Sequence, residues 1–370
     1  MKMTNTKQEK ENAIVVAVCT KKGDALTRKL DEIVRLSESA GLNVVQEFYQ
    51  IIKDFNKATV LGSGKVKEIK DYINTCEEEI DVVIIDYPLS GSQMKNLRKE
   101  FGVKVLDRIG LIIDIFASRA QSREAKLQVK LAQDYYILPK LSEFQGTSGR
   151  FGSAGVGMRG PGETKLELNR RVLDKEMESL KKQIEKIKSQ RQATRKERLK
   201  SDLPKIALVG YTNAGKSSLL NALVKENIYA DDRYFATLDT TTRKLYLSDN
   251  KYAIITDTVG FISDLPHQLV DAFSSTLEEA VDADLILHVV DISLSKEEGG
   301  QKEYQANMKV TGDLLDKLGA TKNRIVVYNK CDLLDKPILL KNNEILVSTK
   351  TKKGLDILLN TIKKNLYIEN

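Results

Sequence analysis

The feature that most constrains the fold of this chain is a glycine-containing segment in its second half, from Gly210 to Ser217. Its spacing is G-x-x-x-x-G-K-S, and it lies between an expected buried strand at 205–210 and an expected helix at 217–224. In this strand–loop–helix context, backbone N–H groups and the helix N-terminus surround phosphate oxygens. We expect Lys216 to neutralise β- and γ-phosphate charge and the Ser217 hydroxyl to ligate Mg²⁺. The predicted nucleotide contacts of this loop are Gly210, Tyr211, Thr212, Asn213, Ala214, Gly215, Lys216 and Ser217.

A second phosphate motif, Asp257-Thr258-Val259-Gly260, follows an expected strand at 251–256. An acidic side chain at the end of that strand can hold Mg²⁺ through a water, and the N–H of Gly260 can reach a γ-phosphate. Alone, D-x-x-G is a weak signal, but it is a strong one roughly 40 residues after a phosphate loop. The pair of motifs therefore predicts a nucleoside triphosphate site.

A threonine-rich segment at 235–243 separates these two motifs. A switch loop at this place needs a hydroxyl to complete the Mg²⁺ shell when the γ-phosphate is present. The residues alone leave the choice open among Thr237, Thr240, Thr241 and Thr242. The residue after the D-x-x-G glycine is Phe261, which cannot orient the attacking water as a glutamine does in many GTPases. We therefore expect slow intrinsic hydrolysis that a partner accelerates by ordering the switch loops.

The predicted base-recognition motif is N-K-x-D at 329–332, after an expected strand at 324–328. The ionised carboxylate of Asp332 only accepts hydrogen bonds, and guanine offers its N1–H and 2-amino donors side by side. Adenine has an acceptor at N1 and no such amino group, so this site would reject it. We expect Asn329 to tie the base loop to the phosphate loop, and backbone N–H groups at 348–350 to meet the guanine oxygen. The predicted contacts are Asn329, Lys330, Cys331, Asp332, Ser348, Thr349 and Lys350. The motifs in this order predict GTP as the substrate.

The rhythm of strand and helix patterns predicts an α/β protein with several parts. An N-terminal parallel-sheet α/β domain is expected at 13–117, an antiparallel helical hairpin at 118–200, and a C-terminal P-loop GTPase domain at 204–370. The segment Leu61-Gly-Ser-Gly-Lys65 has glycines and a lysine, but its spacing is wrong for a phosphate loop. We interpret it as a turn that opens a helix.

The hairpin is predicted from two long helical patterns, at 118–141 and 163–200. Pro139 is expected to mark the end of the first helix. The second helix has apolar residues at heptad spacing and therefore needs a partner. The glycine-rich segment 146–162 is expected to form the tip. The alternative is two core helices of one domain, but the polar remainder of both patterns favours a protruding hairpin.

Composition narrows the class of protein further. The net charge is +7, and a basic chain tends to bind phosphate backbones or anionic membranes. No apolar stretch approaches the roughly 18 residues that span a bilayer, and the polar N-terminus lacks a signal peptide's pattern. We therefore expect a cytoplasmic monomer with no membrane insertion. Three cysteines far apart and only two histidines predict neither a disulfide framework nor a transition-metal site.

Outside the nucleotide motifs, the chain resembles the HflX family of translational GTPases from about residue 13 to 368. The resemblance is carried by VLGSGKVKEI, by SGSQMKNLRKEFGVKVLDRIGLIIDIFASRAQSREAKLQVKLAQ and above all by GRFGSAGVGMRGPGETKLELNRRV. It implies nucleotide contacts at the family's F-A-T-L-D motif, which is here Phe235, Ala236, Thr237, Leu238 and Asp239. It also implies that Thr237 is a Mg²⁺ ligand, and that Thr237 acts with Lys216 and Gly260 in catalysis. Here the aspartate of that motif precedes Thr240, where many relatives have proline.

The resemblance further implies a partner, the large ribosomal subunit near its peptidyl transferase centre, and a role in splitting or rescuing stalled ribosomes. A hairpin whose glycine-rich tip is flanked by arginines is compatible with contact to ribosomal RNA, because arginine pairs bidentately with phosphate. The candidate RNA contacts are Arg150, Arg159, Arg170 and Arg171. Two rivals remain: a GTP switch whose effector is a protein, and an RNA remodeller powered by the same site. Asp332 argues against the remodeller, since such proteins commonly use ATP.

Overall fold

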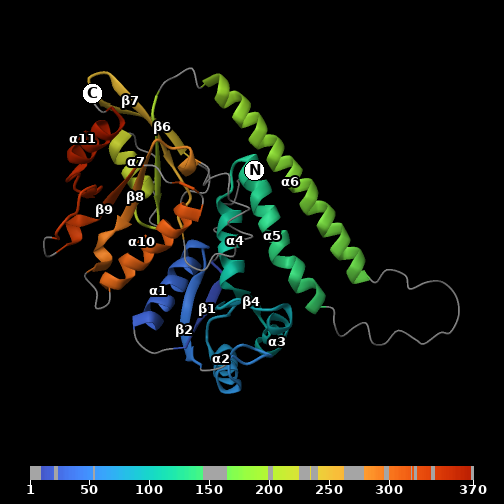
Figure 1. The fold of residues 1–370 in the computed structure, drawn as a ribbon. Helices are drawn as coiled ribbons and strands as arrows, with labels where there is room; N and C mark the ends of the chain where they lie inside the picture. The colour runs from blue at the N-terminus through green and yellow to red at the C-terminus, as the bar shows by residue number, and fades with distance from the viewer. Residues whose placement is uncertain are drawn as a thin grey trace, which may run out of the picture. The chain divides into compact units, whose positions relative to one another are not determined.

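The computed structural model describes residues 10–20, 24–52, 55–144, 165–198, 203–224, 234, 241–261, 279–295, 300–317, 319–320, 323–334 and 338–367. The chain divides into two compact units, one of residues 1–118 with 130–181 and the other of residues 119–129 with 182–370. Each unit is described by itself (Figure 1). Among the described residues, no helix combines the length and apolar character needed to cross a membrane.

The first unit is built on a four-stranded sheet in the order β2-β1-β3-β4, and every neighbouring pair is parallel. The strands are β1 (Asn12–Cys19), β2 (Asn43–Ile51), β3 (Val82–Asp86) and β4 (Lys104–Asp107). Strands β1 and β3 are buried along almost their whole length, as expected for central strands covered on both faces. The predicted parallel-sheet α/β fold of this part is confirmed.

Three helices connect these strands: α1 (Asp24–Ser39), α2 (Ser63–Thr75) and α3 (Gly91–Phe101). Helix α2 begins directly after Gly62, which confirms that the Leu61–Lys65 segment is a turn opening a helix. Helix α3 shows the local chemistry that sets helix boundaries. Ser90 and Gln93 form a capping box at its start, and Gly102 ends it in a left-handed conformation.

A helix directly follows β4. Strand β4 ends at Asp107, and α4 (Arg108–Arg119) begins at the next residue. The Asp107 carboxylate accepts a 2.8 Å hydrogen bond from the backbone N–H of Gly110, which satisfies one of the donors at the start of α4. The Arg108 guanidinium donates to Asp86 and pairs with Glu32, each at 2.9 Å. These tertiary contacts end the strand and start the helix.

The expected end of the next helix at Pro139 is wrong. Helix α5 (Arg123–Phe144) contains Pro139 in its interior. Two side chains on either side of the proline bind the same buried carboxylate of Asp107: the Tyr136 hydroxyl at 2.7 Å and the Lys140 ammonium at 2.7 Å. Because these two contacts hold the helix across the proline, it continues despite the missing backbone hydrogen bond.

The second long helix of the expected hairpin is α6 (Lys165–Arg198). It contacts α5 through an ion pair between Lys130 and Glu176 at 3.4 Å and through Lys181, whose ammonium lies 5.3 Å from the ring centroid of Tyr135. Met177 and Leu180, two of its heptad positions, are buried. The glycine-rich segment 146–162 lies outside the described residues, so its predicted place at the tip stays a prediction.

The second unit carries a six-stranded sheet in the order β10-β9-β8-β5-β7-β6, in which only β6 is antiparallel to its neighbour. Its strands are β5 (Lys205–Gly210), β6 (Thr241–Ser248), β7 (Lys251–Asp257), β8 (Leu285–Asp291), β9 (Arg324–Asn329) and β10 (Glu344–Leu346). Its helices include α7 (Lys216–Val224), α10 (Gly300–Lys317) and α11 (Leu355–Leu366), with short 3₁₀ turns at Ile292–Ser295 and Cys331–Leu333.

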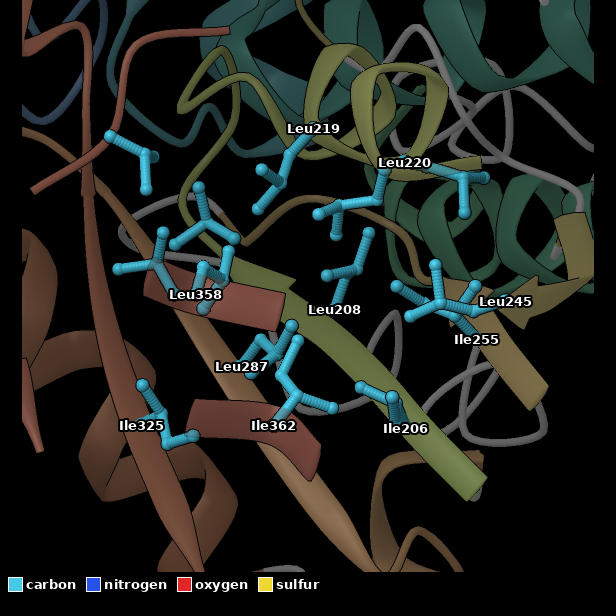
Figure 2. Packing of buried hydrophobic residues seen from close by; sticks show 14 of the residues in the cluster. Ile206, Leu208, Leu219, Leu220, Leu245, Ile255, Leu287, Ile325, Leu358 and Ile362 are labelled. Carbon is cyan, nitrogen blue, oxygen red and sulfur yellow. The ribbon is translucent and has the colours of Figure 1, made fainter. Parts of the chain in front are cut away.

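Alternate residues of β5 face two separate apolar clusters. On one face, Ile206 and Leu208 pack with Leu219 of α7 and Leu358 of α11 (Figure 2). On the other face, Ala207 and Val209 pack with apolar residues that include Leu315 of α10. Strand β5 is therefore buried on both faces, and the loops at the carboxyl ends of the strands are left to form a site.

Candidate nucleotide-binding site

The predicted phosphate loop runs from the end of β5 to the start of α7. Gly215 has φ +87°, and a Cβ built there would lie 2.2 Å from Nδ2 of Asn329. A Cβ on Gly210 would lie 2.2 Å from the carbonyl oxygen of Val289. Both positions therefore exclude any side chain, and the glycines of the motif are required by close approach of neighbouring chain.

Lys216 lies on the inside of this loop. Its Nζ donates to the carbonyl oxygens of Gly210 at 3.1 Å and Tyr211 at 2.9 Å. Burial lowers the pKa of Lys216 to about 8, while the Asp257 carboxylate opposes that shift. The loop thus holds a buried ammonium next to the N-terminus of α7, where positive charge and helix dipole act together on an anion.

The second phosphate motif meets the loop at the start of α7. The Ser217 hydroxyl donates to Oδ2 of Asp257 at 2.6 Å. Asp257 ends β7, the strand beside β5, and the next residue, Thr258, donates its hydroxyl to the Leu208 carbonyl at 2.7 Å. The predicted Mg²⁺ ligand Ser217 and the carboxylate predicted to hold the ion through a water are therefore in direct contact.

Phe261 is hydrogen-bonded to the phosphate loop through its backbone, and Gly260 lies close to the same loop. The Phe261 N–H donates to the Gly210 carbonyl at 3.0 Å, and the Thr212 N–H donates to the Phe261 carbonyl at 2.7 Å. A Cβ on Gly260 would lie 2.9 Å from the Lys216 ammonium. The Phe261 side chain is buried in the apolar cluster with Val209 and Ala280, so it is a core residue with no group that could orient water.

The base motif is tied to the phosphate loop by a single amide side chain. Asn329, at the end of β9, donates from Nδ2 to the Ala214 carbonyl at 3.0 Å, and its Oδ1 accepts from the Thr349 N–H at 3.3 Å. Asn329 is only 1% exposed. One buried amide therefore joins three segments that are far apart in the sequence.

Asp332 is held by Ser348, which belongs to the predicted base-contact segment 348–350. Its Oδ1 accepts a 2.6 Å hydrogen bond from the hydroxyl of Ser348, and the Ser348 Oγ accepts from the Thr351 N–H at 3.0 Å. The preceding residue, Lys330, has φ +63°, in the left-handed region. The carboxylate is thereby fixed by a neutral partner, and its acceptor capacity is only partly used.

The sequence did not single out Asp291, which the structure places in the site. Asp291 ends β8, and its Oδ2 lies 2.6 Å from the Lys330 ammonium. Its Oδ1 accepts from the backbone N–H of Ser293 at 3.0 Å and from the Ser293 hydroxyl at 2.6 Å. Only its position in the sequence could have pointed to Asp291, because an acidic residue at the carboxyl end of a central strand lies at the same edge of the sheet as the phosphate loop.

Several of the predicted site residues are not placed in the nucleotide site by the structure. Phe235, Ala236, Thr237, Leu238, Asp239, Arg150 and Arg159 lie outside the described residues. Arg170 and Arg171 are exposed on α6, and Lys350 is exposed in the turn after Thr349. Within the part of the chain that the structure describes, no cluster of three or more His, Cys, Asp or Glu side chains could hold a metal ion.

Family models match residues 27–330 of the chain in three consecutive pieces. Residues 27–117 match "GTP-binding GTPase N-terminal", residues 119–198 match "GTP-binding GTPase Middle Region", and residues 205–330 match "50S ribosome-binding GTPase". The last piece contains both phosphate motifs and ends at Lys330, inside the base motif.

Curated relatives and solved structures agree with these matches. The chain is 44% identical to GTPase HflX of Caldanaerobacter subterraneus over 99% of this chain and 83% of the relative, and 36% identical to GTPase HflX of Escherichia coli over 91% and 79%. A crystal structure of SsGBP with GDP superimposes with a TM-score of 0.54 at 26% identity, over 96% of this chain and 98% of that one. A GTP-binding protein from Sulfolobus solfataricus with GDP gives 0.51 at 26% identity, over 95% and 98%.

The phosphate and base motifs are in contact at the C-terminal sheet, and the similarity to HflX GTPases extends over nearly the whole chain. The chain therefore belongs to the HflX family of GTPases, and it binds and hydrolyses GTP.

Proposed function

We propose that this GTPase acts on the large ribosomal subunit and takes part in splitting or rescuing stalled ribosomes. The observation that carries the proposal is the match of residues 205–330 to a family described as a 50S ribosome-binding GTPase. Arg170 and Arg171 support it, because they are exposed on α6 and follow the glycine-rich segment closely in the sequence. Ribosomal RNA offers phosphates at which arginine forks can bind bidentately. The proposed protein has three domains, at 13–117, 118–200 and 204–370.

The nucleotide is proposed to bind with its phosphates along the loop 210–217 and its base between 329–332 and 348–350. Lys216 neutralises phosphate charge, and the Gly260 N–H contacts the γ-phosphate. Asp332 accepts from the guanine N1–H and 2-amino group while Ser348 holds its other side. The switch residues 235–239 are proposed to close over the phosphates.

Mg²⁺ fits the donors that this site presents. The Ser217 hydroxyl and the Asp257 carboxylate lie 2.6 Å apart, and both are hard oxygen ligands of the kind that Mg²⁺ prefers. We propose that Ser217 and Thr237 ligate the ion and that Asp257 holds one of its waters. When bound, the ion neutralises charge on the β- and γ-phosphates.

Hydrolysis by the isolated protein is proposed to be slow. Lys216, Thr237 and Gly260 bind and orient the phosphate and the metal, but the side chain that follows Gly260 is the buried Phe261. A partner that orders the switch loops, or supplies a group that positions water, would raise the rate. GTP would then be hydrolysed mainly by protein that is bound to the ribosome.

The second candidate is a regulatory GTP switch whose effector is a protein. Salt dependence separates the two, since RNA binding through several phosphates weakens steeply as salt rises.

We propose a monomer that works in the cytoplasm, where both the ribosome and GTP are found.

The test is co-sedimentation of the protein with purified large subunits, loaded with a non-hydrolysable GTP analogue, across a salt series. We expect binding that falls with salt, and weaker binding by the double variant Arg170→Gln/Arg171→Gln. Lys186→Gln, an exposed basic residue further along the same helix, is the matched control. Binding that no salt concentration changes, or no binding at all with the nucleotide in place, would favour a protein effector.

A further inference from the structure

The β6–β7 hairpin forms one edge of the C-terminal sheet, and its two faces differ in composition. Leu245 and Ile255 point into the apolar core (Figure 2). The residues that alternate with them form the opposite, outward face. Its positions are Thr242, Lys244, Tyr246, Tyr252, Ile254 and Thr256, of which Thr256 is buried. None of these side chains is used by the nucleotide site.

Two tyrosines lie side by side on this outward face. Tyr246 and Tyr252 are cross-strand partners, with ring centroids 5.3 Å apart and planes tilted by 57°. Tyr246 is 55% exposed, an unusual state for an aromatic side chain on a strand beside a core. More than half of Tyr246 is thus open to a ligand at the sheet surface.

Lysines flank the aromatic pair. The Lys244 ammonium lies 4.0 Å from the ring centroid of Tyr252, a cation–π contact. Lys244 pairs with Ile254 of β7, and Ile254 pairs with Lys205 of β5, so both lysines stand in one row across three strands. Side chains of directly paired residues point to the same face, which places both lysines on the face that carries the tyrosines.

The charged side chains at the outward positions of this face are all positive. The outward positions of β6 and β7 contain no carboxylate. At its border, Asp284 accepts a 2.9 Å hydrogen bond from the Lys205 backbone N–H, and in the β6–β7 turn Asp249 is paired with Lys363 of α11. The face therefore presents aromatic rings and ammonium groups, which is complementary to bases joined by phosphates.

We propose that this face, defined by Lys205, Lys244, Tyr246 and Tyr252 and named here the β6–β7 platform, binds single-stranded RNA. A base stacks on Tyr246, and the lysines contact the flanking phosphates. Aromatic side chains on a sheet surface are a recurrent way to hold unpaired bases, and neighbouring cations supply attraction for the backbone. Tyr246 is the stacking residue because Lys244 already covers the ring of Tyr252. The proposal stands apart from the hairpin arginines and does not require the ribosome assignment.

The experiment uses the full chain loaded with GDP and a photocrosslinking RNA of about 12 nucleotides that contains 4-thiouridine, a length suited to a single-stranded site. Crosslinked peptides are identified by mass spectrometry, and affinity is measured in parallel by fluorescence anisotropy across a salt series. We expect a crosslink within residues 241–256. A crosslink near 150–171 would report the hairpin, so the two RNA proposals succeed or fail separately.

Variants then test the chemistry. Tyr246→Ser should weaken RNA binding roughly 5-fold or more and remove the crosslink, whereas Tyr246→Phe should stay within about 2-fold of the wild type because it keeps the ring. Lys244→Gln should reduce the slope of log affinity against log salt by about 0.7, the value for one lost phosphate contact on a single strand. Tyr49→Ser, at an equally exposed tyrosine of β2, and Lys364→Gln on α11 are the matched controls. GDP affinity checks that each variant is folded.

The proposal is overturned if crosslinks occur only outside 241–256, or if Tyr246→Ser and Lys244→Gln bind RNA as tightly as their controls. In that case the exposed tyrosines would be assigned to a protein partner. Failure of the wild-type protein to bind the RNA even at low salt would also overturn it.

Discussion

The Ser217 hydroxyl donates a 2.6 Å hydrogen bond to the Asp257 carboxylate, and so joins the phosphate loop to the end of the neighbouring strand β7. The two residues lie 40 positions apart in the chain. A serine at the start of a helix and an aspartate at the end of a parallel strand meet because β5 and β7 are direct neighbours. This contact brings the proposed Mg²⁺ ligand Ser217 together with Asp257, which is proposed to hold a water of the ion.

Ser217→Ala tests the role of that hydroxyl. Loss of a direct Mg²⁺ ligand should lower the rate of GTP hydrolysis by roughly 100-fold, which corresponds to about 2.7 kcal/mol. The measurement is single-turnover hydrolysis across a Mg²⁺ titration. Ser218→Ala, at the next position of α7, is the matched control and should leave the rate near that of the wild type. Equal rates for the two variants would remove Ser217 from the metal site.

Asp332→Asn should shift base preference from guanine towards xanthine. An asparagine can still accept the Ser348 hydrogen bond through its carbonyl oxygen, while its amide donates to the C2 carbonyl that xanthine has in place of the 2-amino group. Competition binding of GDP and xanthosine diphosphate measures the change, which we expect to exceed about 100-fold in the ratio of affinities. Asp356→Asn in the first turn of α11 serves as control. Unaltered guanine selectivity would contradict the assignment of Asp332.

Asp291 is predicted to act on the base through Lys330. Asp291→Asn removes the charge that holds the Lys330 ammonium at 2.6 Å and should weaken GDP affinity by roughly 3- to 10-fold. The readout is GDP dissociation followed by stopped flow. Asp316→Asn, whose carboxylate pairs with Arg324 on an exposed surface, is the comparison and should change dissociation little. If both variants release GDP at the same rate as the wild type, Asp291 has no positioning role.

Gly215→Ala and Gly64→Ala form a pair that compares a required glycine with a permissive one. A Cβ at Gly215 would lie 2.2 Å from Asn329 Nδ2 and the backbone there has φ +87°, whereas a Cβ at Gly64 meets nothing within 4 Å. We expect Gly215→Ala to abolish measurable GDP binding by isothermal calorimetry. Gly64→Ala should keep binding and stabilise α2 by up to about 1 kcal/mol, since alanine is the better helix former. Intact binding by Gly215→Ala would show that the loop relaxes around the methyl group.

His288 predicts an acid sensitivity of the C-terminal unit. It is 3% exposed in β8, and burial lowers its pKa to about 4 from the ordinary histidine value of 6.5. Because the unfolded state takes up the proton first, the stability from the neutral ring is complete above pH 6.5 and is lost as pH falls towards 4. The loss is on the order of 3 kcal/mol. Urea unfolding at pH 7 and pH 4.5 should show a steeper decline for the wild type than for His288→Leu, and parallel declines would contradict this account.

The nucleotide site was predictable from sequence where its determinants are local. The spacing of Gly210, Gly215 and Lys216 follows from one strand–loop–helix unit, and the base motif is a short segment after another strand. Lys330 could be found in the same way, but its partner Asp291 could not, because the pair depends on β8 lying beside β9. An acidic residue at a strand end has no distinctive sequence spacing.

The middle of the chain was harder to predict for a related reason. Pro139 was expected to end a helix, and that is what its local chemistry favours. The buried carboxylate of Asp107 overrides it, because this one residue caps α4 and binds both Tyr136 and Lys140 of α5. Tertiary contacts of this kind, made by residues more than 25 positions apart, are not visible in helical periodicity.

The most direct test of the account is GTP hydrolysis by the purified protein with and without large ribosomal subunits, at low and at high salt. The account predicts slow turnover by the protein alone, strong stimulation by the subunits at low salt, and loss of that stimulation as salt rises. Rapid turnover by the isolated protein, or intact GTP binding with no stimulation at any salt concentration, would contradict it.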